Sequence, residues 1–179
     1  MRGELDFTES LTRRVRLLAG LPEAALAEVY EHRLRLNPGA ERLMQGLKAA
    51  GIYTILVSGG FTYFTERVAA AAGFAEHRAN HLLFEDGALN GKVTEPILGR
   101  AAKLQALIEI AGQIGAGTDA ALAVGDGAND ISMVEAAGLG VAYHAKPALE
   151  DKADAVIRYS DLTALLHLQG YSEEEFHPD

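Results

Sequence analysis

Apolar residues fall near helical spacing through residues 4–36, as in amphipathic helices. The recurring residues are Phe7, Leu11, Leu18, Leu21, Leu26 and Val29. Gly20-Leu21-Pro22 interrupts the pattern, because proline lacks the amide hydrogen that a continuing helix needs. The segment is therefore predicted to form two helices.

Beyond Asn37-Pro38-Gly39, short apolar runs alternate with helical patterns that end at glycines. Strands separated by helices of this length pair in parallel through right-handed crossovers, and helices cover both faces of the sheet. The predicted fold class is α/β, with a mostly parallel sheet in a three-layer core. The predicted elements are helix 40–50, strand 53–57, helix 61–72, strand 79–84, helix 101–111, strand 122–124, helix 129–137, strand 140–143 and strand 155–157.

A small β-hairpin is predicted within residues 85–92, which contain Asp86-Gly87 and Asn90-Gly91, dipeptides typical of tight turns. The last residues are acidic and without pattern, so we expect a frayed tail. Three parts are thus expected along the chain: helices over 1–37, an α/β core over 38–170 and an acidic tail over 171–179.

The composition restricts the classes of function. With 179 residues, 49% of them apolar, the chain can bury one core of ordinary size. A net charge of −9 opposes a nucleic-acid surface, and the absence of cysteine excludes disulfides and thiolate catalysis. No run is long enough to span a membrane, and Met1-Arg2-Gly3-Glu4 lacks the apolar stretch of a signal peptide, so the cytoplasm is expected.

The most specific string is residues 123–133, in which an apolar strand enters a glycine turn that carries Asp126 and Asp130. Glycines allow a sharp turn, and carboxylates at the C-terminal end of a strand can hold a metal ion beside a phosphate. A helix cap by Asp126 or Asn129 explains any single acid here equally well. It does not explain the whole string.

Two other segments have weaker patterns. Ser58 ends a strand and precedes two glycines, so its hydroxyl and the Gly59 amide could face a phosphate oxygen, although a flexible turn has the same pattern. Lys103 lies at the start of a helix, where a cation could neutralise phosphoryl charge. Most helix lysines are solvated instead, and Arg100 competes for the same role.

Arg14 lies three residues after Leu11 and four before Leu18, which predicts that it shares the apolar stripe of its helix. A cation on an inward face favours an anionic partner. Extension of the side chain to the rim of the helix is the other interpretation.

Taken together, these segments resemble the phosphoserine phosphatases of the haloacid dehalogenase superfamily. Residues 123–133 resemble the fourth motif of the superfamily and residues 56–61 the second, Lys103 matches the lysine of the third, and residues 138–147 continue the match. The resemblance extends from Met1 to about residue 162. It implies a Rossmann-like hydrolase core with a helical cap, and Mg²⁺-dependent hydrolysis of O-phospho-L-serine to serine and phosphate, a step of serine biosynthesis.

The resemblance also implies roles for single residues. Ser58, Gly59 and Lys103 bind the transferring phosphoryl group, and Ser58 and Lys103 count among the catalytic residues. Asn129 binds the phosphate or an ordered water.

Metal and specificity roles follow in the same way from the resemblance. Asp126 coordinates Mg²⁺, and Asp130 supports the catalytic site without direct coordination. In the cap, Arg14 binds the substrate carboxylate in bidentate fashion, and Phe7 lies on the same lid surface.

One motif of the family has no counterpart in this sequence. The first motif, an apolar strand ending in Asp-x-Asp-x-Thr, supplies the aspartate nucleophile and the general acid, whereas the nearest string, Asp6-Phe7-Thr8-Glu9, lacks the second acid. We expect a chain shortened at its amino end, with a truncated cap and little or no activity. A phosphoamino-acid-binding pseudoenzyme and a phosphatase for another small phosphate ester are the alternatives.

The absent strand belongs in the family's sheet between the strands that end at Ser58 and at Asp126. Without it, each of these strands has one unpaired edge. We expect strand 53–57 to close directly onto strand 122–124, or a strand to be borrowed from another copy, which gives a homo-oligomer.

Overall fold

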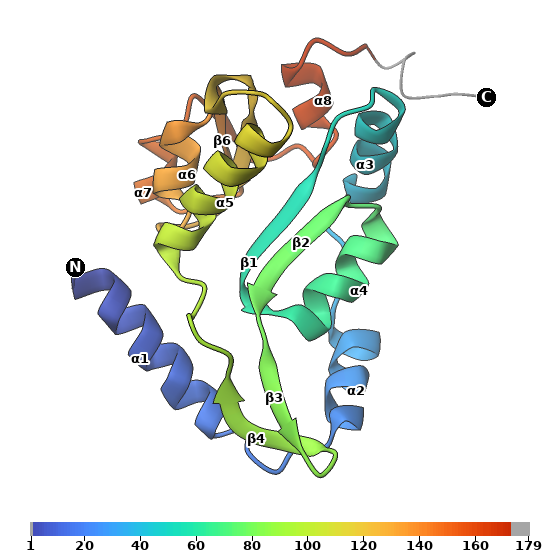
Figure 1. Ribbon diagram of the computed structural model, residues 1–179. Helices are drawn as coiled ribbons and strands as arrows, with labels where there is room; N and C mark the ends of the chain where they lie inside the picture. The colour runs from blue at the N-terminus through green and yellow to red at the C-terminus, as the bar shows by residue number, and fades with distance from the viewer. Residues whose placement is uncertain (1, 173–179) are drawn as a thin grey trace. The chain divides into compact units, whose positions relative to one another are not determined.

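The computed structural model describes residues 2–172, with side chains from Phe7 onward, so most of the predicted acidic tail lies outside the described residues. The fold class is α/β, as predicted, with helices between parallel strands (Figure 1). The chain divides into two compact units: unit 1 is 1–36 with 51–99, and unit 2 is 37–50 with 100–179. The sequence pattern indicates the first boundary and gives no sign that 51–99 joins the N-terminal helices.

Unit 1 confirms the two predicted N-terminal helices and the hairpin. Its elements are α1 (Arg2–Arg16), α2 (Glu23–Arg33), β1 (Ile55–Phe61), α4 (Thr62–Ala72), β2 (Glu76–Asn80), β3 (Leu82–Glu85) and β4 (Ala88–Val93). β1 and β2 pair in parallel, and β3 and β4 pair antiparallel. The prediction of one strand over 79–84 is wrong, because the chain changes partner at His81, from β1 to β4.

The core of unit 1 is formed by α1, α2 and the β3–β4 hairpin. Its buried members are Leu11, Val15, Leu26, Leu82 and Leu89, and Phe7 and Leu18 pack against them. Val15 is 1% exposed and occupies the inward position of α1. The prediction that Arg14 faces inward is therefore wrong: the stripe steps from Leu11 to Val15, and Arg14 is exposed beside it.

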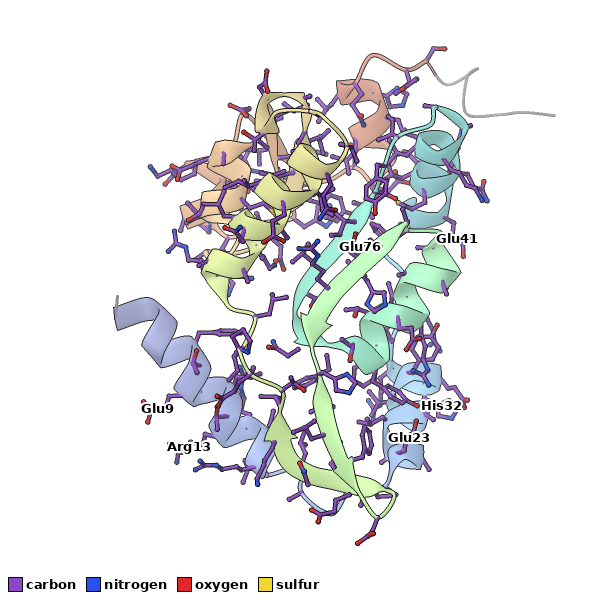
Figure 2. The ribbon with its side chains drawn as sticks, viewed as in Figure 1. Glu9, Arg13, Glu23, His32, Glu41 and Glu76 are labelled. Carbon is purple, nitrogen blue, oxygen red and sulfur yellow. The ribbon has the colours of Figure 1, made fainter. Side chains whose placement is uncertain are left out.

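Polar residues of the two N-terminal helices point away from this core. Glu9 and Arg13 on α1, and Glu23 and His32 on α2, are exposed (Figure 2). Gly91, with φ at +77°, allows the end of α1 and the turn after it to pack closely on β4, since an added Cβ would lie 3.4 Å from Arg16 Cα and 3.0 Å from Ala19 Cβ. A larger side chain there would push the helix away from the hairpin.

Unit 2 is a three-layer arrangement around β6. Its elements are α3 (Ala40–Ala49), α5 (Arg100–Gln113), η1 (Thr118–Ala120), β5 (Leu122–Gly125), α6 (Ile131–Ala136), β6 (Leu139–Tyr143), α7 (Pro147–Glu150), β7 (Ala155–Ile157) and α8 (Ala164–Leu168). The strands pair in parallel in the order β5-β6-β7. The short η1, α7 and α8 are not predicted from the sequence, because elements of three to five residues are too short for periodicity to appear.

Helices cover both faces of the unit 2 sheet. Val141 and Tyr143 pack on one face with Leu43 of α3 and Leu166 of α8. On the other face, Ala142 packs with α6 and α7. β6 is therefore buried on both faces, which explains its continuous apolar sequence.

The strands that end near Ser58 and Asp126 belong to separate sheets. Within the described residues, β1 pairs with β2 and β5 pairs with β6, and β1 does not pair with β5. The expected direct closure of strand 53–57 onto strand 122–124 is therefore wrong. None of the helices in residues 2–172 combines the length and apolarity that a membrane crossing requires.

Candidate active site

The end of β1 forms a bulged turn at Ser58-Gly59-Gly60. Val57 pairs with Arg78 and Phe61 with Asn80, so four steps along β1 correspond to two steps along β2. Two residues are therefore in excess on β1, and the ladder is interrupted at this turn. The bulge lies within β1, close to the C-terminal end of the strand, where α/β proteins bind their ligands.

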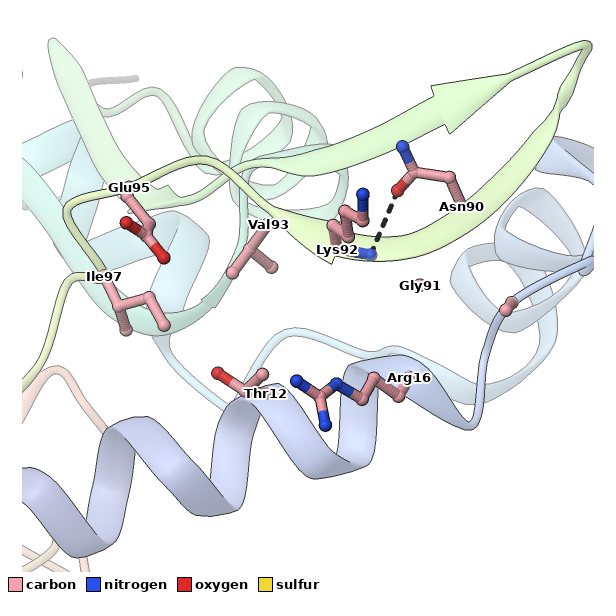
Figure 3. A pocket seen from close by; sticks show the side chains of 9 residues that line it. Thr12, Arg16, Asn90, Gly91, Lys92, Val93, Glu95 and Ile97 are labelled. Carbon is pink, nitrogen blue, oxygen red and sulfur yellow. Dashed lines mark hydrogen bonds between the residues drawn. The ribbon is translucent and has the colours of Figure 1, made fainter.

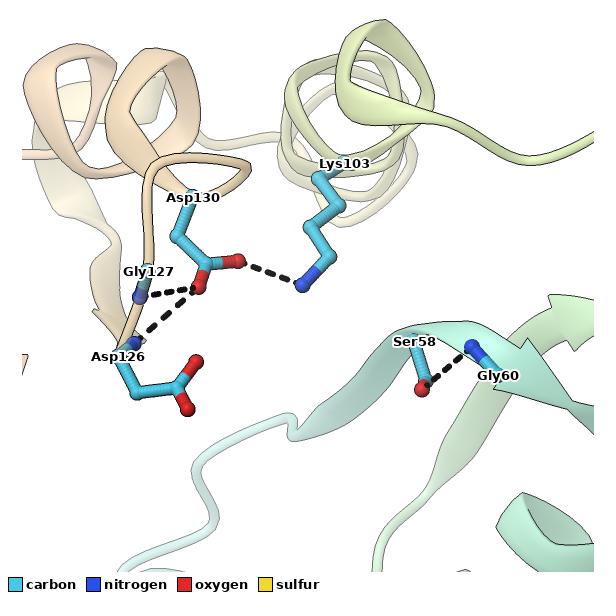
Figure 4. A network of polar contacts seen from close by, with 6 residues as sticks. All are labelled: Ser58, Gly60, Lys103, Asp126, Gly127 and Asp130. Carbon is cyan, nitrogen blue, oxygen red and sulfur yellow. Dashed lines mark hydrogen bonds and ion pairs between the residues drawn. The ribbon is translucent and has the colours of Figure 1, made fainter. Parts of the chain in front are cut away.

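The hydroxyl of Ser58 accepts a hydrogen bond from the backbone N–H of Gly60, with the two heavy atoms 3.0 Å apart (Figure 4). A hydroxyl that accepts still has its own O–H to donate. This geometry holds the oxygen in place and leaves one donor for an acceptor such as a phosphate oxygen.

In unit 2, a buried ion pair joins α5 to the turn after β5. Lys103 Nζ lies 2.5 Å from Asp130 Oδ1, and the two side chains are 11% and 3% exposed. The other carboxylate oxygen of Asp130 accepts from the backbone N–H groups of Asp126 and Gly127, at 3.1 and 3.2 Å (Figure 4). Asp130 thus fixes the lysine and shapes the turn that carries Asp126.

Gly125 is required by this arrangement, because a Cβ added there would overlap the Cβ of Asp130. Helix α6 begins at Ile131 rather than at the predicted residue 129, with Asp130 at its N-cap position. The carboxylate of Asp130 makes no capping bond to the helix. Its oxygens are instead used by the lysine and by the turn.

The carboxylate of Asp126 has a different environment. Asp126 and Asn129 are exposed, and the backbone C=O of Asp126 accepts from the N–H of Lys146 at 3.0 Å. The backbone is thus held while the side chain stays accessible. Of the two aspartates in the turn, Asp126 is the one whose oxygens can bind a ligand.

The donor set fits Mg²⁺ in part. Mg²⁺ accepts one or two carboxylates and fills its other positions with waters and phosphate oxygens. Asp126 offers such an oxygen, whereas Asp130 is occupied by Lys103 and by two amides. In the described part of the chain, no three His, Asp or Glu side chains form a metal-binding group.

Arg14 lies on the exposed side of α1, where its Nε donates to the backbone C=O of Ser10 at 3.3 Å. The guanidinium has five donors, so this single bond leaves most of them for another acceptor. An exposed Arg14 is consistent with binding a carboxylate from solution.

A cavity of about 360 Å³ lies between α1 and β4 in unit 1, with Thr12 and Arg16 pointing toward the strand (Figure 3). None of the predicted site residues lines it. The cavity and the predicted chemistry are therefore separate features of the molecule.

Asn80 is a polar residue that the sequence analysis misses. It is 3% exposed, and its side chain bonds to Gly59 and to Leu98. Asn80 stands among polar residues, with Arg78 two positions before it and His81 directly after it, and such an asparagine is typical of a turn, so the sequence carries no signal for this role.

Comparison with protein families gives a match over residues 1–135 to the haloacid dehalogenase-like hydrolases. Among curated proteins, the chain is 47% identical over 173 residues to a phosphoserine phosphatase from Polaromonas sp. strain JS666. That alignment covers 94% of this chain and 73% of the relative.

Two solved structures have similar folds. One is a HAD family hydrolase from Salmonella enterica subsp. enterica serovar Typhi, which is 38% identical to this chain with a TM-score of 0.87. The match covers 94% of this chain and 57% of the Salmonella chain. The other is a phospho-aspartyl intermediate analogue of phosphoserine phosphatase, which is 39% identical to this chain with a TM-score of 0.85. The match covers 94% of this chain and 80% of that phosphatase chain. This chain thus spans little more than half of the Salmonella protein.

Proposed function

The chain belongs to the haloacid dehalogenase-like hydrolases, and from this premise we propose that its site is that of a phosphoserine phosphatase, for O-phospho-L-serine. The observation that carries the proposal is the Lys103–Asp130 pair. Lys103 is buried and lies 2.5 Å from a carboxylate that also accepts from two turn amides. Burial of a charged pair costs free energy, so a role in stability alone is a poor explanation for it. Through Asp130, the pair ties the lysine to the turn that carries the accessible carboxylate of Asp126.

Each phosphate-binding residue has a defined task in this proposal. Lys103 donates one hydrogen to Asp130 and has two more for phosphoryl oxygens, whose developing charge it neutralises. Ser58 donates its O–H to a phosphoryl oxygen while its own oxygen stays fixed by the Gly60 amide. The Gly59 amide and Asn129 add further donors, as the family resemblance implies.

Asp126 is the residue that would hold Mg²⁺. The ion, when bound, supplies further neutralisation of phosphoryl charge. Asp130 takes no part in coordination, and acts by keeping the Asp126 turn and the lysine in place. Arg14 binds the carboxylate of the substrate, which separates phosphoserine from phosphate esters without a carboxylate.

The proposal includes a limit on catalysis by the 179 residues alone. Hydrolysis through a phospho-aspartyl intermediate needs a nucleophilic aspartate, and the sequence contains no Asp-x-Asp-x-Thr string. Binding of phosphoserine without turnover is therefore proposed for this polypeptide. The cytoplasmic location and strand exchange between copies stay predictions.

Calorimetric titration of the chain with O-phospho-L-serine in the presence of Mg²⁺ tests the proposal. We expect saturable binding that is lost in Ser58→Ala and in Lys103→Met, and kept in Lys152→Met, whose exposed lysine pairs with Glu135 at 3.2 Å. Equal affinity for phosphoethanolamine, which lacks the carboxylate, would favour the alternative of another small phosphate ester. Absence of any binding would refute the proposal.

A further inference from the structure

We propose that Asn80 is a positioning residue that sets the geometry of the Ser58-Gly59-Gly60 turn. The inference rests on the proposed function, in which Ser58 and Gly59 of that turn bind the phosphoryl group. Asn80 is the last residue of β2 and the register partner of Phe61, directly after the turn. It is therefore placed where the β1–β2 ladder resumes.

The side chain of Asn80 replaces a ladder bond that the bulge removes. Its Nδ2 donates to the backbone C=O of Gly59 over 3.0 Å. Because the excess residues of β1 interrupt backbone pairing with β2, this carbonyl would otherwise point into a buried region with no strand partner. The bond fixes the peptide plane between Gly59 and Gly60, and hence the direction of the Gly60 amide that holds the Ser58 hydroxyl.

The same carboxamide also binds the segment that leads to α5. The backbone N–H of Leu98 donates to Asn80 Oδ1 over 2.7 Å, and Nδ2 donates to the C=O of Leu98 over 3.3 Å. Asn80 thus pairs with Leu98 as a neighbouring strand residue would, and it joins that residue to the Gly59 turn. A carboxylate lacks the two donors, and a serine hydroxyl cannot make three bonds of this geometry.

Phe7 packs against the same two segments. A Cβ added to Gly59 would lie 3.1 Å from Phe7 Cζ, and one added to Gly99 would lie 3.5 Å from Phe7 Cδ1. The aromatic ring therefore covers the turn and the residue after Leu98 at once. Asn80 itself is 3% exposed, so its bonds are made away from water, which strengthens them.

The test compares Asn80→Asp with Asn90→Asp by titration with inorganic phosphate, followed through the backbone amides of residues 58–60 in NMR spectra. The Asn90 side chain serves as an acceptor from the Lys92 amide at 3.0 Å, a role that aspartate keeps. We expect Asn80→Asp to weaken phosphate binding about tenfold and to lower the melting temperature, because the carbonyls of Gly59 and Leu98 lose their donor, and we expect Asn90→Asp to bind as the unchanged chain does. Unchanged affinity in a folded Asn80→Asp chain would overturn the inference.

A second measurement needs neither a variant nor bound phosphate. In the unchanged chain, the backbone amide of Leu98 and the side-chain amide of Asn80 should exchange with solvent as slowly as the β1–β2 ladder amides. Fast exchange of both would overturn the inference even if Asn80→Asp fails to fold. If the unchanged chain binds no phosphate, the proposed function fails, and slow exchange at these amides still supports the positioning role of Asn80.

Discussion

Replacement of Lys103 by methionine tests the buried ion pair on which the site is built. Methionine keeps most of the length of the side chain and removes its charge, so the carboxylate of Asp130 is left in the interior with two amide donors. Removal of one partner from a buried pair costs about 3–5 kcal/mol of the free energy of unfolding. Because the two amide bonds remain, we expect a loss near the lower end, about 3 kcal/mol.

Lys152→Met is the matched control in the same unit. Its partner Glu135 lies 3.2 Å away, and the two side chains are 53% and 45% exposed, compared with 11% and 3% for the buried pair. An exposed pair contributes about 0–1 kcal/mol, so we expect little change. The comparison holds the type of substitution constant and varies only the burial.

Urea unfolding followed by far-ultraviolet circular dichroism measures both losses. Asp130→Asn alone and the double variant Lys103→Met/Asp130→Asn complete the cycle that measures the coupling. We expect a coupling of about 1–3 kcal/mol, since the two side chains are in direct contact. A Lys103→Met chain as stable as Lys152→Met would refute the reasoning, because it would show that Lys103 is effectively solvated.

Four further variants test other parts of the molecule. Arg14→Ala should weaken O-phospho-L-serine about tenfold and leave phosphoethanolamine unchanged in a binding titration, and equal losses would mean that Arg14 does not read the carboxylate. Hydrogen bonds from Thr163, first from its hydroxyl and then from its backbone amide, lower the pKa of Asp161. That contribution to stability exists above about pH 4 and is lost as the pH falls through the lowered value, so Thr163→Val should cost about 1 kcal/mol at pH 7 and progressively less as the pH falls below about 4. Gly112→Ala, in α5 with open space around it, should stabilise the chain by up to about 1 kcal/mol. Gly138→Ala should destabilise it, because the added Cβ would overlap the backbone of Asp119. Melting temperatures that change in the same direction for both variants would contradict this packing.

The sequence predicts the fold well where glycine and proline mark the ends of elements. Gly73, with φ at +91°, ends α4 where expected, and its N–H bonds to the C=O of Ala69. The single strand predicted over 79–84 fails for a reason that local pattern cannot show. Both β2 and β3 suit extended backbone, and only the change of pairing partner at His81 separates them.

The candidate site is predictable in its residue types and less so in their contacts. The spacing of Asp126 and Asp130 identifies the turn, but only the structure shows that Asp130 is occupied by Lys103 and by two amides. The prediction for Arg14 is wrong because Arg14 lies three residues after Leu11 and Val15 lies four residues after it, and both spacings suit one face of a helix. In the structure the apolar Val15 is buried and Arg14 is exposed. Asn80 bonds to Gly59 and Leu98, which lie 21 and 18 residues away in the sequence. Contacts between such distant residues leave no periodic pattern in the sequence.

The most direct test of the central claim is phosphate release from O-phospho-L-serine with Mg²⁺, measured for two polypeptides. One is the 179-residue chain, and the other is the same chain fused behind an apolar strand that ends in Asp-x-Asp-x-Thr. We expect turnover above about 1 s⁻¹ for the fusion and none for the chain alone. Turnover at that rate by the chain alone would refute this expectation, because it would show that the 179 residues contain a nucleophile outside any Asp-x-Asp-x-Thr string.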